Sequence, residues 1–271
     1  MEKTERAVRR VRHELKFRLL RVSAVRHVTP RLLRVTLAGD DLAGFASAAH
    51  DDHVKLFFPQ PGQDRPAVPA PGPDGMVFPE GQPRPAARDY TPRRYDAAAG
   101  ELDIEFALHG DGPAAEWAQQ AAVGQYLGVG GPRGSFVLEG RFDGYLLVGD
   151  ETALPAIARR LEELPAGARA VVVAEVADAA EEQPFDTRAE VEVHWVHRDG
   201  ARPGDPERLA QAVAALEPPP GDWYGWVAAE SGVAKRVRQV LVDGWRLPKA
   251  WIKAAGYWKQ GAAATHDKHE D

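Results

Sequence analysis

The hydrophobic pattern of this chain changes period near its middle, and this change limits the possible folds more than any other feature. Before about residue 140 the apolar residues form short runs with the two-residue period of β-strands, as in Leu102–Leu108, where large apolar residues occupy every second position. Pro113–Ala122 has the pattern of a helix, with a proline suited to its first turn. The predicted strands are Phe17–Val28, Leu32–Leu37, His53–Phe58, Arg88–Thr91, Leu102–Leu108, Tyr126–Val129 and Ser135–Leu138. Many short strands with one short helix predict a β-barrel.

In the second half of the chain, strands alternate with helices. The predicted strands are Tyr145–Val148, Ala170–Val176, Val191–His197, Tyr224–Ala228 and Ala250–Ala254, and the predicted helices are Leu154–Leu164, Asp205–Leu216 and Ser231–Leu241. This alternation predicts an α/β domain with a doubly wound parallel sheet, which binds ligands at the carboxyl ends of its strands. We therefore predict two domains, residues 1–142 and 143–261, followed by a flexible tail at residues 262–271.

Composition excludes several classes of function. The chain of 271 residues has 0 cysteines, which excludes disulfides, cysteine-ligated iron–sulfur clusters and thiolate zinc sites. No run of about 18 apolar residues occurs, so no membrane span is expected. The N-terminal segment has no secretory pattern, so a cytoplasmic protein is expected. The basic segment Met1–Arg34 lacks the interleaved aromatic residues of nucleic-acid binders, so no nucleic-acid partner is expected.

The segment Pro59–Pro85 interrupts the first domain. It holds nine of the 22 prolines of the chain, and we expect it to be a surface loop without regular structure.

The segment Arg88–Arg93 (RDYTPR) carries the most chemical information. The two-residue period of a strand places Arg88 and Tyr90 on one face. There the Arg88 guanidinium can neutralise a pyrophosphate, the Tyr90 ring can lie against a flavin, and the Thr91 hydroxyl can donate a hydrogen bond to a ring nitrogen. The same residues also suit a charged edge strand with one aromatic core residue, and the hexapeptide alone favours neither interpretation.

Three glycine-containing segments follow. His109–Trp117 (HGDGPAAEW) places glycines before a helix, where free N–H groups and the helix dipole favour a phosphate, although a tight strand-to-helix turn also needs glycines. Gly130–Ser135 (GGPRGS) ends the barrel. Gly149–Ala156 (GDETALPA) follows the first strand of the α/β domain and opens its first helix, where a dinucleotide pyrophosphate binds in such folds. It is not a GxGxxG motif and is by itself only suggestive.

Taken together and in this order, these segments resemble the siderophore-interacting proteins, a branch of the ferredoxin-reductase-like flavoproteins. The matching segments are Arg88-x-Tyr90-Thr91-x-Arg93, HGDGPAAEWA, GPRG, GDETALPAI and the terminal GYWKQG at Gly256–Gly261. The resemblance extends from about Phe17 to Gly261. It implies FAD bound to a six-stranded antiparallel barrel, NADPH or NADH bound to the second domain, and reduction of ferric siderophores with release of Fe(II).

The resemblance also implies roles for individual residues. The cofactor-binding residues are Arg88, Tyr90, Thr91, Arg93, His109, Gly112, Pro113, Ala114, Ala115 and Trp117 for the flavin, and Asp150, Glu151, Thr152 and Pro155 for the nicotinamide nucleotide. Tyr257 and Trp258 resemble an aromatic pair near the flavin face. No catalytic acid, base or nucleophile is expected, because the flavin carries the chemistry. The main departure from the family is the Pro59–Pro85 insertion, onto which no family role can be transferred.

Many ferric siderophores are anionic, so we expect basic groups to steer them on this acidic protein, whose net charge is -6. The candidates are Lys55, Arg133 and Lys259, each of which is equally compatible with a solvated surface cation. Arg198, near the end of a predicted α/β strand, can hold the 2′-phosphate of NADPH or serve only as a loop charge.

Two other functions remain open. A general flavin or ferredoxin reductase on the same fold would share FAD and NAD(P)H but not the ferric substrate. A siderophore-binding protein without turnover would not need the flavin and nucleotide motifs. A metal site at His50–His53 has no partner cluster, and His194 and His197 face opposite sides of a strand, so no metal ligand set is expected. A monomer is expected.

Overall fold

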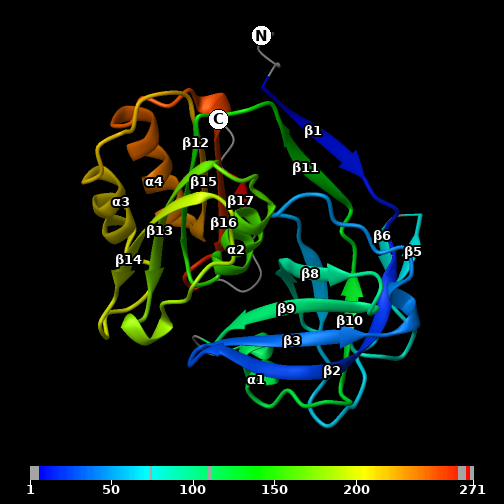
Figure 1. The fold of residues 1–271 in the computed structure, drawn as a ribbon. Helices are drawn as coiled ribbons and strands as arrows, with labels where there is room; N and C mark the ends of the chain where they lie inside the picture. Colours follow the sequence, from blue (N-terminus) through cyan, green and yellow to red (C-terminus); the bar gives the residue numbers. More distant parts are fainter. Residues whose placement is uncertain (1–5, 74, 109–111, 262–266, 269–271) are drawn as a thin grey trace. The chain divides into compact units, whose positions relative to one another are not determined.

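The computed structural model of the protein describes residues 6–73, 75–108, 112–261 and 267–268. The chain divides into two compact units, Met1–Gly140 and Arg141–Asp271 (Figure 1). Each unit has its own hydrophobic core.

The first unit is an antiparallel sheet whose two edges meet. The strand order is β7 (Ala87–Tyr90), β4 (Val54–Phe57), β10 (Tyr126–Gly130), β2 (Phe17–Thr29), β3 (Leu32–Ala38), β9 (Glu101–Ala107) and β8 (Pro92–Asp96). The edge strands β7 and β8 are separated in the chain only by Thr91, so the sheet closes on itself. The predicted barrel is confirmed, with seven strands in place of six because one strand is broken. Pro92 lacks an N–H donor, and the register shifts between Pro92 and Arg94.

Apolar side chains from the inner face of this sheet fill the barrel. The fully buried ones include Leu20, Val22, Val35, Leu37, Leu56, Ile104 and Leu127. Helix α1 (Pro113–Gln119) adds Trp117, whose ring centroid lies 5.9 Å from that of Phe58 and 5.6 Å from that of Phe106. The predicted helix is confirmed, although it ends before Ala122.

Two pairings outside the barrel sheet of the first unit were not expected from the sequence. Strand β1 (Ala7–Arg12) pairs with β11 (Gly134–Glu139) in a separate two-stranded sheet. The expectation that Pro59–Pro85 lacks regular structure is wrong, because β5 (Ala70–Gly72) pairs with β6 (Gly75–Val77). Proline is tolerated in such a short edge pair, where few N–H groups need partners.

The Pro59–Pro85 segment packs on the outer face of the barrel of its own unit. The Phe78 ring lies edge-on to Phe57 with 6.1 Å between centroids, and the Arg65 guanidinium lies 4.2 Å from the Tyr126 ring centroid. A Cβ at Gly128 would lie 3.0 Å from Cγ2 of Val68, so glycine makes room for this contact. The insertion therefore covers barrel surface that would otherwise expose Phe57.

The second unit is a mixed sheet built around five parallel strands. The order is β14 (Glu190–His197), β13 (Arg169–Val176), β12 (Gly144–Asp150), β15 (Trp223–Glu230), β16 (Ile252–Trp258) and β17 (Asp267–Lys268). All pairs are parallel except that of β16 with β17. The predicted doubly wound parallel sheet is confirmed. In chain order its parallel strands lie 3-2-1-4-5, so the order reverses between β12 and β15, and ligands bind outside the carboxyl ends of strands at such a point.

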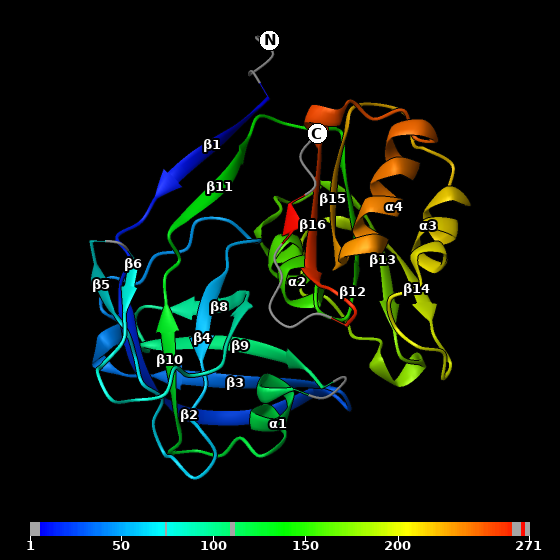
Figure 2. The same ribbon diagram turned by 180° about the vertical axis from the view of Figure 1, so that it is seen from behind.

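Helices cover both faces of this sheet. Helices α3 (Pro206–Ala214) and α4 (Ser231–Asp243) pack on one face, and α2 (Leu154–Glu163) lies on the other (Figures 1 and 2). The tail predicted at residues 262–271 is not wholly without structure, because β17 pairs with β16 at Ala255 and Gly256. None of the helices in the described ranges is long and apolar enough to cross a membrane.

Candidate functional site

In the first unit, the closing strand of the barrel presents Arg88 and Tyr90 on one face, as predicted. Their partners on β4 are Leu56 and Val54, both of which belong to the barrel core, and directly opposite residues of a ladder share a face. The Tyr90 ring lies 4.6 Å from that of Phe106. Burial raises the pKa of Tyr90 far above its usual range, and the nearby Arg88 guanidinium offsets part of this rise. The phenol is therefore neutral at any physiological pH.

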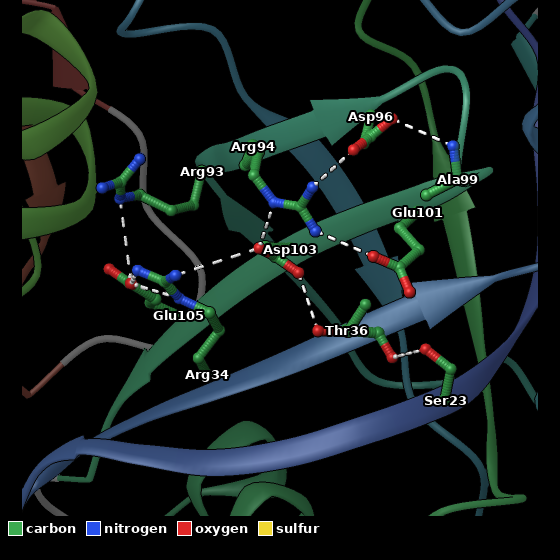
Figure 3. Close-up of polar contacts among 10 residues, drawn as sticks. All are labelled: Ser23, Arg34, Thr36, Arg93, Arg94, Asp96, Ala99, Glu101, Asp103 and Glu105. Carbon is green, nitrogen blue, oxygen red and sulfur yellow. Dashed lines mark hydrogen bonds and ion pairs between the residues drawn. The ribbon is translucent and has the colours of Figure 1, made fainter. Parts of the chain in front are cut away.

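Thr91 and Arg93 follow at the break in the strand, and both are buried, at 7% and 8% exposure. Nε of Arg93 lies 3.8 Å from Oε1 of Glu105 on β9. The Glu105 side chain is 1% exposed, and its Oε1 also accepts a hydrogen bond of 2.8 Å from Nε of Arg34 (Figure 3). Two arginines thus share one buried carboxylate beside Thr91.

Asp103 forms the second half of this buried polar cluster. Its carboxylate accepts a bond of 2.7 Å from Oγ1 of Thr36 and another of 2.7 Å from Nε of Arg94 (Figure 3). Hydrogen bonds to Asp103 and Glu101 raise the pKa of Arg94 above its usual range. The cluster ties β3, β8 and β9 together and positions Arg93. This cluster was not predicted from the sequence, although acidic residues at alternate positions of β9 and arginines in β3 and β8 were a signal for it.

Two features at the start of α1 suit the binding of a cofactor. Gly112 has φ of 154°, a backbone conformation that favours glycine, and no atom lies within 4 Å of the position a Cβ would take. Trp117 is 4% exposed, yet its Nε1 has no hydrogen-bond partner among the residues that the structure describes. Pro113, Ala114 and Ala115 form the first turn between these two residues. His109 lies outside the described residues. An open backbone and an unsatisfied indole donor suit the FAD that the family resemblance implies.

In the second unit, Asp150 ends β12 and its carboxylate is fully used within the protein. Its Oδ1 accepts from the backbone N–H of Thr152 at 3.0 Å. Its Oδ2 accepts from the backbone N–H of Glu230 at 3.1 Å and from Nε1 of Trp258 at 2.8 Å. The carboxyl ends of β12, β15 and β16 are therefore joined by a single side chain at the point where the strand order reverses.

The loop after β12 is held tightly against the sheet. A Cβ on Gly149 would lie 2.4 Å from Cβ of Ala153 and 2.6 Å from the Ala228 carbonyl oxygen, so only glycine fits. Pro155 then occupies the first turn of α2 and is buried. The GDETALPA segment lies at a strand-to-helix turn, as predicted.

The predicted aromatic pair lies at the end of β16. The register between β15 and β16 shifts after Ala229, so that Glu230 pairs with Trp258 and Tyr257 is the extra residue of a bulge. The Tyr257 ring packs edge-on to Trp226 with 6.2 Å between centroids. The structure thus brings Trp258 together with Asp150, two residues of segments that are far apart in the sequence.

Arg198 is neither a free loop charge nor an accessible phosphate ligand. Its side chain is 6% exposed and makes a two-pronged ion pair with Glu151, with Nη1–Oε2 and Nη2–Oε1 distances of 2.5 and 2.7 Å. Its Nη1 also lies 3.4 Å from Oε1 of Glu175, and Arg208 donates to the same oxygen at 3.3 Å. Burial raises the pKa of Glu175 to about 7, although the two arginines act in the opposite direction.

The three candidate substrate cations differ in their surroundings. Lys55 pairs with Asp89 at 2.6 Å and is only partly exposed. Arg133 and Lys259 are exposed, Arg133 in the first unit just after the cis peptide bond between Gly131 and Pro132, and Lys259 in the second unit after Trp258. The structure therefore leaves Arg133 and Lys259 more accessible than Lys55.

The segment His50–His53 has a structural use. Oδ2 of Asp52 accepts hydrogen bonds from Oγ of Ser135 at 2.5 Å and from Oγ of Ser47 at 2.8 Å. Nε2 of His13 lies 2.7 Å from Oγ of the same Ser135. Within the described ranges, no group of three or more His, Cys, Asp or Glu residues is arranged to hold a metal ion.

Two family models match the chain. A siderophore-interacting FAD-binding domain matches residues 21–136, and the siderophore-interacting protein model matches residues 142–261. A ferredoxin reductase of carbazole 1,9a-dioxygenase, 19% identical with a TM-score of 0.61, shares the fold and covers 88% of this chain and 68% of that chain.

Several proteins are similar over nearly the whole chain. The NADPH-dependent ferric-chelate reductase of Escherichia coli (strain K12) is 38% identical over 262 residues, which are 95% of this chain and 99% of that protein. The ferric vibriobactin reductase ViuB of Vibrio cholerae serotype O1 is 36% identical over 90% of each chain. The crystal structure of a siderophore utilization protein from T. fusca is 42% identical with a TM-score of 0.88, covering 97% of this chain and 99% of that chain. The chain therefore belongs to the siderophore-interacting protein family, and its first unit is the FAD-binding domain of that family.

Proposed function

We propose that this protein is an FAD-dependent oxidoreductase that takes electrons from NADPH or NADH and reduces ferric siderophores, releasing Fe(II). The observation that carries the proposal is the closing strand of the barrel, where Arg88 and Tyr90 share one face beside the buried Thr91. The names of the Escherichia coli and Vibrio cholerae relatives, a ferric-chelate reductase and a ferric vibriobactin reductase, support the same substrate class.

The electron count explains why such a protein needs a flavin. A nicotinamide delivers two electrons as a hydride, whereas Fe(III) accepts one electron at a time, and the bound flavin would supply the conversion between the two. NADPH and two Fe(III) give NADP⁺, two Fe(II) and one proton, so no side chain has to act as an acid, base or nucleophile. The protein has to bind the flavin and the nicotinamide nucleotide, orient them toward each other and the ferric chelate, and shield them from water.

On the flavin side, each residue has a role that its surroundings allow. Arg88 would neutralise a phosphate, and the neutral Tyr90 ring would lie against the ring system. Thr91 would hydrogen-bond the ring, and Arg93 is held beside it by Glu105. The remaining flavin contacts are His109, the backbone of Gly112, Pro113, Ala114 and Ala115, and Nε1 of Trp117.

On the nucleotide side, the acidic loop would act mainly through its shape. The side chains of Asp150, Glu151 and Thr152 are bonded within the protein, the Thr152 hydroxyl to Oδ1 of Asp150. A nucleotide would therefore meet the backbone of this loop and the start of α2 at Pro155. Tyr257 and Trp258 would provide the aromatic surface at the end of β16.

The ferric chelate would be attracted by Lys55, Arg133 and Lys259. Lys55 would have to exchange its Asp89 partner for the substrate, whereas Arg133 and Lys259 are exposed. We also propose a monomer in the cytoplasm. Among the described residues, the exposed large hydrophobic side chains are Val8, Val77 and Val123, which do not neighbour each other in sequence.

The test is a visible spectrum of the purified protein, followed by anaerobic addition of NADPH or NADH, a ferric siderophore and a dye that traps Fe(II). We expect flavin absorbance that bleaches with nucleotide, then two Fe(II) per nucleotide oxidised. Bleaching without Fe(II) release would favour a general flavin reductase. A colourless protein that neither takes up FAD nor releases iron would leave a binding protein as the better account.

A further inference from the structure

We propose that Arg208, together with Arg202, holds the 2′-phosphate of the nicotinamide nucleotide and thereby selects NADPH over NADH. This assignment rests on the proposed function, because it requires that the second unit binds such a nucleotide. The sequence suggests Arg198, directly after β14, as the ligand of the 2′-phosphate. The proposal gives this role instead to Arg202, in the loop that follows, and to Arg208, in helix α3.

The strand order of the second unit indicates where the 2′-phosphate of a bound nucleotide would lie. β13 is the second strand of the doubly wound sheet, and in this topology the adenosine ribose lies near the end of the second strand, where an acidic residue binds the 2′-hydroxyl or an arginine accommodates the 2′-phosphate. Glu175 lies near the carboxyl end of β13 and contacts both Arg198 and Arg208. Glu175 itself is 2% exposed, so it is poorly placed to bind a ribose hydroxyl.

Of the two arginines at Glu175, Arg198 is already committed. Both of its terminal nitrogens bond to Glu151 at 2.5 and 2.7 Å, and its side chain is almost fully buried. Moving it to a phosphate would leave the Glu151 carboxylate, 14% exposed, without this partner. Arg198 is therefore a structural residue that holds the loop after β12 to the end of β14.

Arg208, unlike Arg198, is partly exposed and only loosely held by its neighbours. It lies in the first turn of α3, its side chain is 20% exposed, and its contacts are all long. Nη1 lies 3.3 Å from Oε1 of Glu175 and 3.5 Å from the Arg202 carbonyl oxygen, and Nη2 lies 3.7 Å from Oδ2 of Asp205. A guanidinium held this loosely can turn to a phosphate, with which it forms shorter and stronger paired bonds.

Arg202 supplies a second cation beside it. Its side chain is exposed and makes no hydrogen bond or ion pair to any residue in the described part of the chain. The loop that carries it contains Gly200 and Gly204, with φ of 89° and 87°, so the backbone turns twice between β14 and α3. A 2′-phosphate at this loop would meet one cation from the loop and one from the helix.

Glu175 makes the site sensitive to protons. Its pKa is raised to about 7, mainly by burial. Arg208 and Arg198 oppose this rise, and the facing carboxylates Asp150 and Glu151 add to it. Asp205 faces Arg208 from the start of α3. A phosphate at Arg208 would draw that guanidinium away and add negative charge, and both changes raise the pKa of Glu175. Binding of the 2′-phosphate would therefore take up a proton.

The first test measures binding without turnover. Calorimetric titrations of the full-length holoprotein with 2′,5′-ADP and with 5′-AMP isolate the 2′-phosphate. We expect Arg208→Gln to weaken 2′,5′-ADP roughly 10- to 100-fold, with 5′-AMP unchanged within about twofold. The matched control is Arg169→Gln, which removes an exposed arginine at the amino end of the same strand, β13. It should change neither affinity.

Equal weakening of both probes by Arg208→Gln would mean a structural role and would overturn the assignment, as would a wild-type protein that binds the two probes equally. If Arg208→Gln does not fold, Arg208→Lys decides the point: it should lose affinity for 2′,5′-ADP selectively, because a point charge lacks the planar fork. A wild-type protein that binds neither probe nor NADPH would overturn the proposed function together with this inference.

The second test measures whether binding of 2′,5′-ADP takes up a proton. At about pH 7.5, where a phosphate monoester is already almost fully ionised, the heat of 2′,5′-ADP binding should depend on the ionisation heat of the buffer in the direction of proton uptake. Glu175→Gln should remove this dependence, and 5′-AMP should never show it. Proton uptake that persists in Glu175→Gln would contradict the proposed arrangement.

Discussion

Nε1 of Trp258 donates a hydrogen bond of 2.8 Å to Oδ2 of Asp150, across 108 positions of sequence. The same oxygen accepts from the backbone N–H of Glu230. This contact joins the loop after β12 to the aromatic pair at the end of β16, so two segments to which the family resemblance gives separate roles lie together in the second unit.

Breaking this contact should affect stability and nucleotide binding together. Asp150→Asn turns an amide NH₂ either toward the Thr152 donors, its backbone N–H and its hydroxyl, or toward the N–H groups of Glu230 and Trp258, all of which the carboxylate accepts from. We expect the free energy of unfolding to fall by about 1–3 kcal/mol and the KM for NADPH to rise. Trp258→Phe removes the bond from the other side, so the double variant should lose much less than the sum of the single effects.

Urea unfolding of the full-length protein and steady-state kinetics measure these effects. Asp243→Asn, at an exposed position at the end of α4, is the matched control and should be neutral within about 0.5 kcal/mol. Strict additivity of Asp150→Asn and Trp258→Phe would mean that the bond does not couple the two residues.

The buried cluster of the barrel should be costly to break at Glu105. Glu105→Ala leaves Arg34 and Arg93 without the carboxylate that they share, and we expect a loss of about 3–5 kcal/mol in the free energy of unfolding. Glu101→Ala removes a carboxylate that is 34% exposed and should cost less than about 1 kcal/mol. Because Glu105 also positions Arg93, the variant should retain less FAD after gel filtration. Equal stability losses for the two variants would show that burial does not decide the effect.

Tyr90 should matter to the flavin through its ring rather than its hydroxyl. Burial keeps the phenol neutral, so Tyr90→Phe preserves both the ring and its charge state. We expect Tyr90→Phe to bind FAD within about threefold of the wild type and Tyr90→Ala to bind it roughly tenfold or more weakly. Quenching of flavin fluorescence on titration with apoprotein measures both affinities. A large loss in Tyr90→Phe would assign the role to the hydroxyl instead.

Glu175 should make stability depend on pH in a defined direction. Burial raises its pKa in the folded protein to about 7, above the value of 4.5 that is usual for a glutamate in an unfolded chain. Its contribution is therefore fully present below about pH 4.5 and is lost as the pH rises through 7, by up to about 3 kcal/mol. Glu175→Gln removes this term, so the wild type should lose stability relative to the variant between pH 5 and 8. Urea unfolding of both proteins across this pH range measures the difference. If the free energies of unfolding of the two proteins change with pH in parallel, Glu175 does not make stability depend on pH.

The sequence alone was sufficient for the architecture and for the order of the motifs. The change from a two-residue period to alternating strands and helices predicted the barrel and the doubly wound sheet. It also placed Arg88 and Tyr90 on one face, since neighbouring residues of a strand alternate in direction. It missed β8 (PRRYD) and β1 (AVRRVR), which are short and charged and become strands because β9 and β11 pair with them.

Only the tertiary structure decided the partners of the charged residues. Nothing local distinguishes Arg198, whose guanidinium is buried on Glu151 at a separation of 47 residues, from Arg208, which remains partly exposed. The same holds for Glu105 with Arg34 and for Asp150 with Trp258. The periodicity of strands and helices can be seen in consecutive residues of the sequence. The free energy of a charged group, in contrast, depends on its burial and on the opposite charges that the fold brings near it.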